Sequence, residues 1–205
     1  MPHPTDEPLG HPVHVEVLGP TRIDAPAPTG DRVRALTSMC VWLALHPDPA
    51  GCQIDRALVI SAESRTSTLS RLRAWLGPDV VPLNRAAGRY QLRATTDWAT
   101  VQQTVCDSSG RLRSTAGPTE LTAALAPVRG EPLADIGAAW ADAERLQMTM
   151  LIADIAHRLA RHHLRRRQMA EATWALGRGL LAAPDDDRLR RLARLMRGNR
   201  IRSAA

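Results

Sequence analysis

The sequence predicts an α+β protein that is mostly α-helical, with a small strand-containing part first and an all-helical part behind it. Three observations predict this class. Apolar and polar residues alternate in residues 13–19, as in a half-buried strand. Three segments with helical spacing follow, and after them two strand-like runs flank a glycine turn. From Asp97 onward the apolar residues recur only at helical spacing.

The N-terminal strands come first. Residues 1–12 contain four prolines and no periodicity, so we expect a disordered lead-in. From Val13 the run VHVEVLG predicts a strand, Gly19 and Pro20 predict a turn, and TRID predicts a short returning strand.

Three helices are predicted next, at about 33–46, 53–60 and 61–77. Ser61 or Ser64 can cap the third helix, and Gly77 followed by Pro78 ends it. The runs VVPL (80–83) and RYQLRA (89–94) then predict two strands around a turn in which Gly88 can take a positive φ. Three helices followed by a hairpin make a winged helix-turn-helix domain, which we place at 13–94.

The rest of the chain predicts an all-α domain at 95–197, followed by a disordered tail at 198–205. Its helices are expected at about 98–106, 118–126, 138–163, 168–182 and 186–196. In the longest helix, the residues expected on the inward stripe are Trp140, Ala143, Leu146, Met150, Leu151, Ile155 and Leu159. Paired antiparallel helices of this length are typical of tetratricopeptide (TPR)-like domains, although the sequence shows no clean repeat of about 34 residues.

Composition and charge narrow the classes of partner. Of the 205 residues 44% are hydrophobic, which is enough for a core, and the net charge is +6. Residues 51–95 hold seven arginines against three acidic residues, and residues 151–205 hold thirteen against five. No lysine occurs in the chain. Two separate basic regions suit an anionic partner.

Location and chemistry are constrained mainly by what the sequence lacks. Three cysteines without paired spacing predict neither disulfides nor zinc and fit a reducing cytoplasm. We expect no membrane segment, because no apolar run approaches the ~20 residues that span a bilayer. The sequence offers no phosphate-binding glycine loop and no nucleophile with a matching base, so we expect no enzyme, no catalytic residue and no cofactor. His157, His162 and His163 do not share a helix face, so no metal site is expected.

The third helix carries the first candidate site, in TSTLSRLRAWLG (66–77). Its leucines form one stripe, while Ser67, Ser70 and Arg71 cluster on the opposite face. No acidic residue lies between Arg65 and Gly77, so a negative group from outside can complete this face. Arg73, at the edge of the stripe, can reach a phosphate; the alternative is that it caps the helix C-terminus and that Arg71 is only solvated.

Two more arginine groups are candidates. In the predicted wing, Arg85 and Arg89 can enter a narrow minor groove, or they can simply keep an exposed strand soluble. In the run RHHLRRRQ (161–168), Arg165, Arg166 and Arg167 can bind a phosphate or an acidic protein. The alternative for this run is favourable interaction with the dipole at the end of a long helix.

Several short segments of the sequence, taken in order, resemble those of a known family. They are VEVLGPTRI, WLALHP, TLSRLRAWLG, GRYQL, DWATVQQTV and VRGEPLADIGAAWADAERLQ. Together they resemble the bacterial transcriptional activator domain (BTAD) family, the SARP type of actinobacterial regulators, in which an OmpR-like winged helix precedes a helical activator domain. The resemblance implies that the helix containing SRLR lies in the DNA major groove, that the wing touches the neighbouring minor groove, and that the helical domain contacts partners such as RNA polymerase. The DNA-binding residues would then be Ser67, Ser70, Arg71, Arg73, Arg85 and Arg89.

A second class of function remains open at this stage. The chain can be a protein–protein interaction module that keeps the winged-helix and BTAD-like fold without sequence-specific DNA binding. The larger excess of arginine at the C-terminal end motivates this alternative. Promoter-directed DNA binding would discriminate the two classes.

Overall fold

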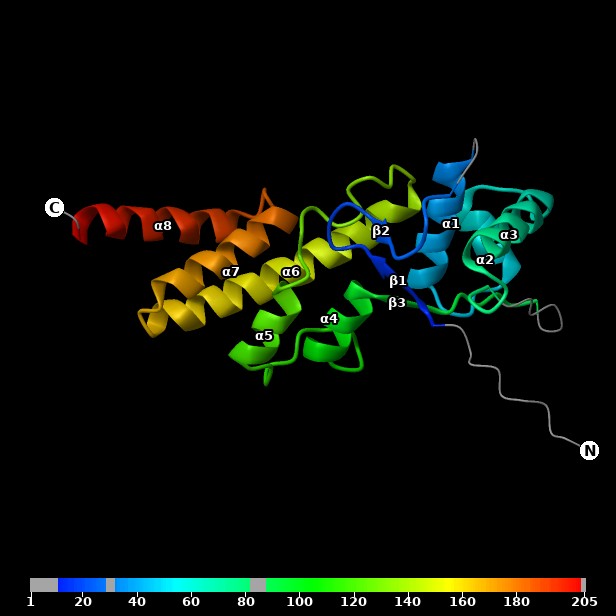
Figure 1. Cartoon of the computed structure of the whole chain (residues 1–205). Coiled ribbons are helices and arrows are strands. Elements are labelled where there is room, and N and C mark those ends of the chain that lie inside the picture. Colours follow the sequence, from blue (N-terminus) through cyan, green and yellow to red (C-terminus); the bar gives the residue numbers. More distant parts are fainter. Residues whose placement is uncertain (1–10, 29–31, 82–87, 204–205) are drawn as a thin grey trace, which may run out of the picture. The chain divides into compact units, whose positions relative to one another are not determined.

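The computed structural model describes residues 11–28, 32–81 and 88–203 of the chain. It is α+β and mostly helical, which confirms the predicted coarse class. The expected lead-in at 1–12 falls almost wholly outside the described residues. The elements in chain order (Figure 1) are β1 (Val13–Glu16), β2 (Arg22–Ile23), α1 (Val33–Leu45), α2 (Gly51–Leu58), α3 (Ala62–Leu76), β3 (Ala94–Thr96), α4 (Asp97–Val105), α5 (Pro118–Leu125), α6 (Trp140–Arg165), α7 (Met169–Ala182) and α8 (Asp187–Ser203).

The chain forms two compact units, and the second takes a segment from the N-terminal region. The first unit holds Arg22–Thr96 and the residues up to Val15, and the second holds Glu16–Thr21 and the residues from Asp97 on. The sequence placed 16–21 in the first domain, which is wrong. The predicted domain boundary, between 94 and 95, lies two residues before the division between Thr96 and Asp97.

Three helices form the body of the first unit. α3 packs against both α1 and α2. The inward face of α1 includes Leu36, Met39 and Leu43, at the spacing that the sequence predicted. Val59 ends α2 in the left-handed conformation (φ 53°) and is 84% exposed. A left-handed residue reverses the chain direction, so its side chain leaves the helix face.

The sheet of the first unit differs from the predicted wing hairpin. Its strand order is β2-β1-β3, and β1 pairs with β3 in parallel, Val13 opposite Ala94 and Val15 opposite Thr96. Among the described residues of 80–93 no strand is formed, and one backbone hydrogen bond, from Arg93 N to Val80 O (2.8 Å), links the two predicted runs. In the observed sheet, Val13 and Val15 of β1 are buried.

A buried carboxylate organises the second unit where the chain enters it. Asp97, the first residue of α4, accepts three backbone N–H bonds: Oδ1 from Val17 (2.8 Å) and Trp98 (2.9 Å), and Oδ2 from Leu18 (3.1 Å). Asp97 is only 5% exposed. Burial raises the pKa of Asp97 above its ordinary value, and the three N–H donors act in the opposite direction.

The carbonyls of the same buried segment are also satisfied. Val17 O accepts from Leu133 N (2.9 Å), and Leu18 O accepts from Arg129 N (2.7 Å). Gly19 follows with φ 154°, and a Cβ there would lie 3.0 Å from the Cβ of Arg129. Only glycine allows this close approach in this conformation. The segment is therefore an inserted strand-like piece whose backbone polar groups find partners in the helical unit.

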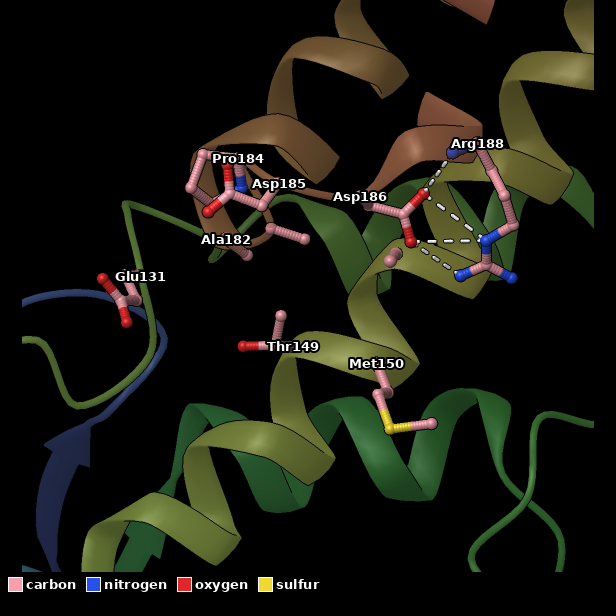
Figure 2. A pocket seen from close by; sticks show the side chains of 10 residues that line it. Glu131, Thr149, Met150, Ala182, Pro184, Asp185, Asp186 and Arg188 are labelled. Carbon is pink, nitrogen blue, oxygen red and sulfur yellow. Dashed lines mark hydrogen bonds and ion pairs between the residues drawn. The ribbon is translucent and has the colours of Figure 1, made fainter. Parts of the chain in front are cut away.

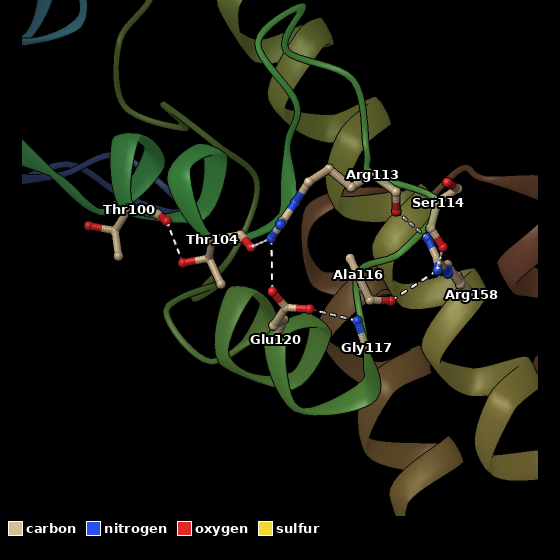
Figure 3. Close-up of polar contacts among 8 residues, drawn as sticks. All are labelled: Thr100, Thr104, Arg113, Ser114, Ala116, Gly117, Glu120 and Arg158. Atoms are coloured by element: carbon tan, nitrogen blue, oxygen red, sulfur yellow. Dashed lines mark hydrogen bonds and ion pairs between the residues drawn. The ribbon is translucent and has the colours of Figure 1, made fainter.

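Two arginines hold the connection between α4 and α5 (Figure 3). Arg113 donates to the carbonyl of Thr104 and to Glu120 Oε1 (2.8 Å), and Glu120 Oε2 accepts from Gly117 N (2.7 Å). The pKa of Glu120 is lowered, mainly by the hydrogen bond from Gly117 N and further by the charge of Arg113. The N-terminus of α5 is thereby capped by a residue of its own first turn.

Arg158, on α6, holds the same connection from the other side. Its guanidinium donates to the carbonyls of Arg113 (2.6 Å), Ser114 and Ala116 (2.9 Å). One guanidinium thus satisfies three carbonyls of a segment without regular structure, which its planar set of donors makes possible.

The three C-terminal helices pack in sequence, α6 on α7 and α8 on both (Figure 1). Ile155 and Leu159 of the predicted stripe of α6 are buried, as expected. Leu146 and Met150 are 61% and 58% exposed and Ala143 is exposed too, so these three expected inward positions are wrong. Alanines occupy much of the true stripe, because α7 approaches closely enough that Gly179 lies against Ala156. The buried residues are Ala141, Met148, Ile152, Ala153, Ile155, Ala156, Leu159 and Ala160.

The last helix is longer than the sequence suggested. α8 continues to Ser203, so the predicted disordered tail from 198 is wrong for residues 198–203. Gly198 costs a helix only about 1 kcal/mol, and the flanking arginines favour helix. Residues 204–205 lie outside the described part of the chain.

Replacement of Asp97 tests the role of the buried carboxylate. Asp97→Asn keeps the size but places an amide N–H₂ against backbone N–H donors, so we expect a loss of about 2–3 kcal/mol in the free energy of unfolding. The matched control is Asp135→Asn, because Asp135 accepts from Thr21 N (2.8 Å) in an exposed position. Denaturation by urea measures both variants. Equal, small losses would show that Asp97 is not a structural anchor.

The cysteines provide a second test. Burial raises the pKa of the Cys40 thiol to about 12, whereas Cys52 is exposed. Since the thiolate is the reactive form, a thiol reagent at about pH 8 should modify Cys52 quickly in the native protein and Cys40 only after unfolding. Peptide mass spectrometry of the labelled protein identifies the sites, and Cys52→Ser should remove the fast phase. Rapid labelling of native Cys40 would contradict the packing of α1.

Candidate nucleic-acid interface

α3 is built to present one face outward. Ser61 Oγ accepts from Ser64 N (3.1 Å) and caps the helix, and Gly77 (φ 96°) ends it, as predicted from the sequence. Leu69 and Leu72 are buried on the inward side. The helix is thereby fixed in rotation about its axis, which determines which side chains face outward.

The outward face contains three of the predicted DNA-binding residues. Ser67, Ser70 and Arg71 are all exposed. Arg71 makes no hydrogen bond or ion pair with any other residue in the described part of the chain. Glu63, in the first turn, is the acidic residue of this helix. The structure brings the three residues together on one face, about one helical turn long.

Arg65 is a residue of this region that the sequence reasoning missed. Its guanidinium pairs with Asp55 of α2 and lies 5.5 Å from the centre of the Tyr90 ring. Burial acts to lower the pKa of Arg65, but the hydrogen bonds that the guanidinium makes to Asp55 and Tyr90 outweigh it, and the pKa is raised. Gly51 makes room for the group, because a Cβ there would lie 2.8 Å from the Arg65 Cζ. Asp55 and Tyr90 lie outside α3 in the sequence, so the spacing of residues within α3 does not predict their contacts with Arg65.

The side chain of Arg73 forms hydrogen bonds within the protein. Its Nη1 donates to the carbonyls of Val81 (2.6 Å) and Pro78 (3.2 Å), beyond the end of α3. These acceptors lie beyond the helix end, so Arg73 holds the chain that leaves α3, a contact that neither sequence-based alternative included. The contact fixes the segment before residues 82–87, which lie outside the described part.

The two predicted wing arginines differ. Arg89 donates through Nη1 to Asp48 O (3.0 Å) and pairs through Nε with Asp48 Oδ2 (3.3 Å), with 48% of its side chain exposed. Arg89 also forms an isolated bridge with Ala50. Part of its guanidinium thus remains accessible, but its position is set by the turn before α2. Arg85 lies outside the described residues.

The second basic site is the turn between α6 and α7. Arg165, Arg166 and Arg167 are exposed, and within the described residues none has an intramolecular hydrogen-bond or ion-pair partner for its side chain. Arg167 adopts the left-handed conformation (φ 58°), and His163 and Gln168 are linked across the turn (2.8 Å). The turn therefore presents three consecutive cations at the end of a 26-residue helix.

A cavity of about 350 Å³ lies beside α6 and the start of α8 (Figure 2). Its charged groups are paired within the protein: Asp186 with Arg188 (2.8 Å), Asp185 with Arg190, and Glu131 with Arg145 (3.7 Å). This pairing leaves the cavity no uncompensated charge with which to select a ligand.

Two further properties of the described residues bear on the kind of site. None of the described helices is long and apolar enough to cross a membrane. Within the same residues, no group of three or more His, Cys, Asp or Glu side chains is placed to hold a metal ion.

Comparisons with models of protein families, with curated protein sequences and with solved structures give no match to this chain. The assignment of function therefore rests on the geometry of the chain's own residues.

Replacement of Arg73 separates its structural use from DNA contact. Arg73→Ala leaves the buried Val81 carbonyl without its donor, so we expect the protein to lose about 1–2 kcal/mol of stability. Arg71→Ala is the control, because the exposed Arg71 has no described partner, and it should change stability by less than about 0.5 kcal/mol. Thermal unfolding followed by circular dichroism measures both. If the two variants melt alike, the hydrogen bonds of Arg73 contribute nothing to the fold.

Proposed function

We propose that this chain is a DNA-binding transcriptional regulator of the SARP/BTAD type, in which the first unit is a winged helix-turn-helix domain and α3 is its recognition helix. The observation that carries the proposal is the outward face of α3, where Ser67 and Ser70 lie together with Arg71, whose side chain has no partner among the residues that the structure describes. Arg65, Arg73 and Arg89 of this unit are engaged in the fold, whereas Arg71 is exposed on the same face as the two serines.

The chemistry of this face suits a base edge. An arginine can donate two hydrogen bonds to O6 and N7 of guanine in the major groove, and a serine hydroxyl can donate or accept at several bases. Small side chains such as Ser67 and Ser70 let the helix approach the groove floor, since they do not hold it away. The rigid cap and the buried leucines keep the face in one orientation, which reduces the entropy lost on binding.

The proposed role of the wing changes from the sequence expectation. Arg89 is anchored to Asp48, so it acts as a fixed cation at the base of the wing, available for a phosphate through its exposed part. Arg85 remains a proposed minor-groove or phosphate contact. Arg73 supports the wing through Val81 and is no longer proposed as a direct DNA contact.

The helical unit is proposed to contact a protein partner, such as RNA polymerase. The exposed arginines of the α6–α7 turn support a binding role for this unit. The same observation favours the second candidate function, a protein-interaction module without sequence-specific DNA binding, because these cations lie far along the chain from α3.

The test is a fluorescence anisotropy titration of the full chain with duplex DNA from its own upstream region and with a random duplex of equal length. Arg71→Ala should weaken binding to the specific duplex by about 5- to 150-fold, equivalent to about 1–3 kcal/mol, and should weaken binding to the random duplex much less. Arg111→Ala is the matched control, since it removes the same exposed charge from the second unit. Raising the salt concentration should weaken binding to both duplexes.

Two outcomes would contradict the proposal. One is the same affinity for every duplex tried, which would exclude sequence reading. The other is binding that is insensitive to Arg71→Ala but lost on joint replacement of Arg165, Arg166 and Arg167 by alanine. That result would move anion binding to the α6–α7 turn and favour the interaction module.

A further inference from the structure

A shallow apolar groove runs between α7 and α8 in the second unit. It encloses about 280 Å³. Leu176 and Met196 form its buried floor, at 3% and 9% exposure, and Leu180 is half-buried at one end. The groove is lined by Met169, Thr173, Leu176, Gly177, Leu180, Ala193, Met196 and Arg197.

Gly177 is a glycine that this chain's own packing does not require. It lies in the interior of α7, where glycine costs helix stability relative to alanine, and it is exposed. A Cβ at Gly177 would meet nothing within 4 Å. Gly179, two residues on, is different: a Cβ there would lie 2.5 Å from Ala156 Cβ and 2.8 Å from Leu189 Cδ1. Gly179 serves the contact of α7 with α6 and α8, whereas Gly177 keeps open space in the groove wall.

The charge around the groove is positive. A neighbouring hollow of about 380 Å³ continues along α8 and is lined by Arg190, Arg194 and Arg197, with Asp187 as its acidic residue. Arg190 is occupied by Asp185 and the Pro184 carbonyl. Arg194 and Arg197 have no intramolecular partner for their side chains in the described part of the chain.

We propose that the α7–α8 groove docks an acidic amphipathic helix of a partner protein. The partner's apolar residues would pack on Leu180 and Met196, its backbone would approach at Gly177, and its carboxylates would pair with Arg194 and Arg197. The groove from Met169 to Leu180 is about 16 Å long, which accommodates about three turns of helix. This inference rests on the protein-contacting half of the proposed function and does not require DNA binding by α3.

Charge and surface type select this occupant over two others. A second copy of the chain, docking through its own α8, would bring arginine against arginine, which is repulsive. Duplex DNA would satisfy Arg194 and Arg197 but would leave the apolar floor at Leu180 and Met196 against a polar phosphate backbone. An acidic amphipathic helix satisfies both the apolar floor and the cations.

The test is a titration of the full chain into a fluorescent synthetic peptide of about 18 residues, with leucines at helical spacing and glutamates on both flanks. A scrambled peptide of the same composition is the control for net charge. We expect saturable binding of the amphipathic peptide, and at least about tenfold weaker binding of the scrambled one, because only the first can present an apolar face.

Three variants locate the site. Gly177→Trp fills the groove and should weaken peptide binding at least about tenfold, whereas Gly177→Ala should raise the melting temperature and keep most of the affinity. Arg194→Glu with Arg197→Glu should also weaken binding at least about tenfold. The matched control, Arg111→Glu with Arg161→Glu, makes the same charge change at two exposed arginines elsewhere in the second unit and should weaken it much less. Circular dichroism checks that each variant is folded, and the surface charge variants decide the question if Gly177→Trp does not fold.

The outcomes are distinguishable. Peptide binding that resists both Gly177→Trp and the Arg194/Arg197 reversal overturns the groove, as does equal binding of the scrambled peptide. A dimer in sedimentation that Gly177→Trp dissociates would overturn the partner in favour of a second copy. DNA titration of the same variants separates this inference from the regulator proposal: loss of peptide binding with specific DNA affinity intact supports the groove, whereas loss of affinity for DNA alone in the Arg194/Arg197 variant assigns the surface to DNA.

Discussion

The hydrogen bonds of the Asp97 carboxylate are the interaction on which the organisation of the second unit depends. Asp97 is the first residue of α4, and its carboxylate accepts hydrogen bonds from the backbone N–H groups of Val17 and Leu18. These two residues precede the main segment of the first unit in the sequence, whereas Asp97 follows it. Without these acceptors, two buried donors would be unsatisfied inside the helical unit, at a cost of about 1–3 kcal/mol each. A strand that begins in one unit can therefore end in the other, and the helical unit includes residues from both sides of the first unit's sequence.

Arginine serves two distinct purposes in this lysine-free chain. Arg73, Arg113 and Arg158 donate to carbonyls of segments that lack regular structure, where the planar guanidinium can satisfy two or three acceptors at once. Arg71 and Arg194, in contrast, are exposed and unpartnered among the described residues. The proposed recognition face of α3 and the proposed docking groove depend on the second group. Net charge overstates the binding surface, because arginines of the first group are counted in it although their donors are already used.

The recognition face and the docking groove follow the same physical logic. At α3, buried leucines fix the rotation of the helix about its axis, and the small side chains of the serines on its outward face allow another molecule to come close to the helix backbone. In the second unit, Gly179 brings α7 against its neighbours, while Gly177 leaves the adjacent wall open. In both places the fold supplies a rigid surface with small residues at the point of approach and a cation beside it. Such surfaces bind with little loss of conformational entropy, since the binding side is already ordered.

The sequence by itself determined most of the helices, because apolar periodicity, the Ser61 cap and the Gly77 stop are local signals that act within one or two turns. It also determined that Ser67, Ser70 and Arg71 share a face, since helical geometry alone fixes that relation. Only the tertiary structure decided that residues 16–21 belong with the helical unit, that Arg73 and Arg89 are held by Val81 and Asp48, and that Met148 rather than Met150 faces inward. Those outcomes depend on hydrogen bonds and close contacts between residues far apart in the chain, whose energies no local pattern of residue types records.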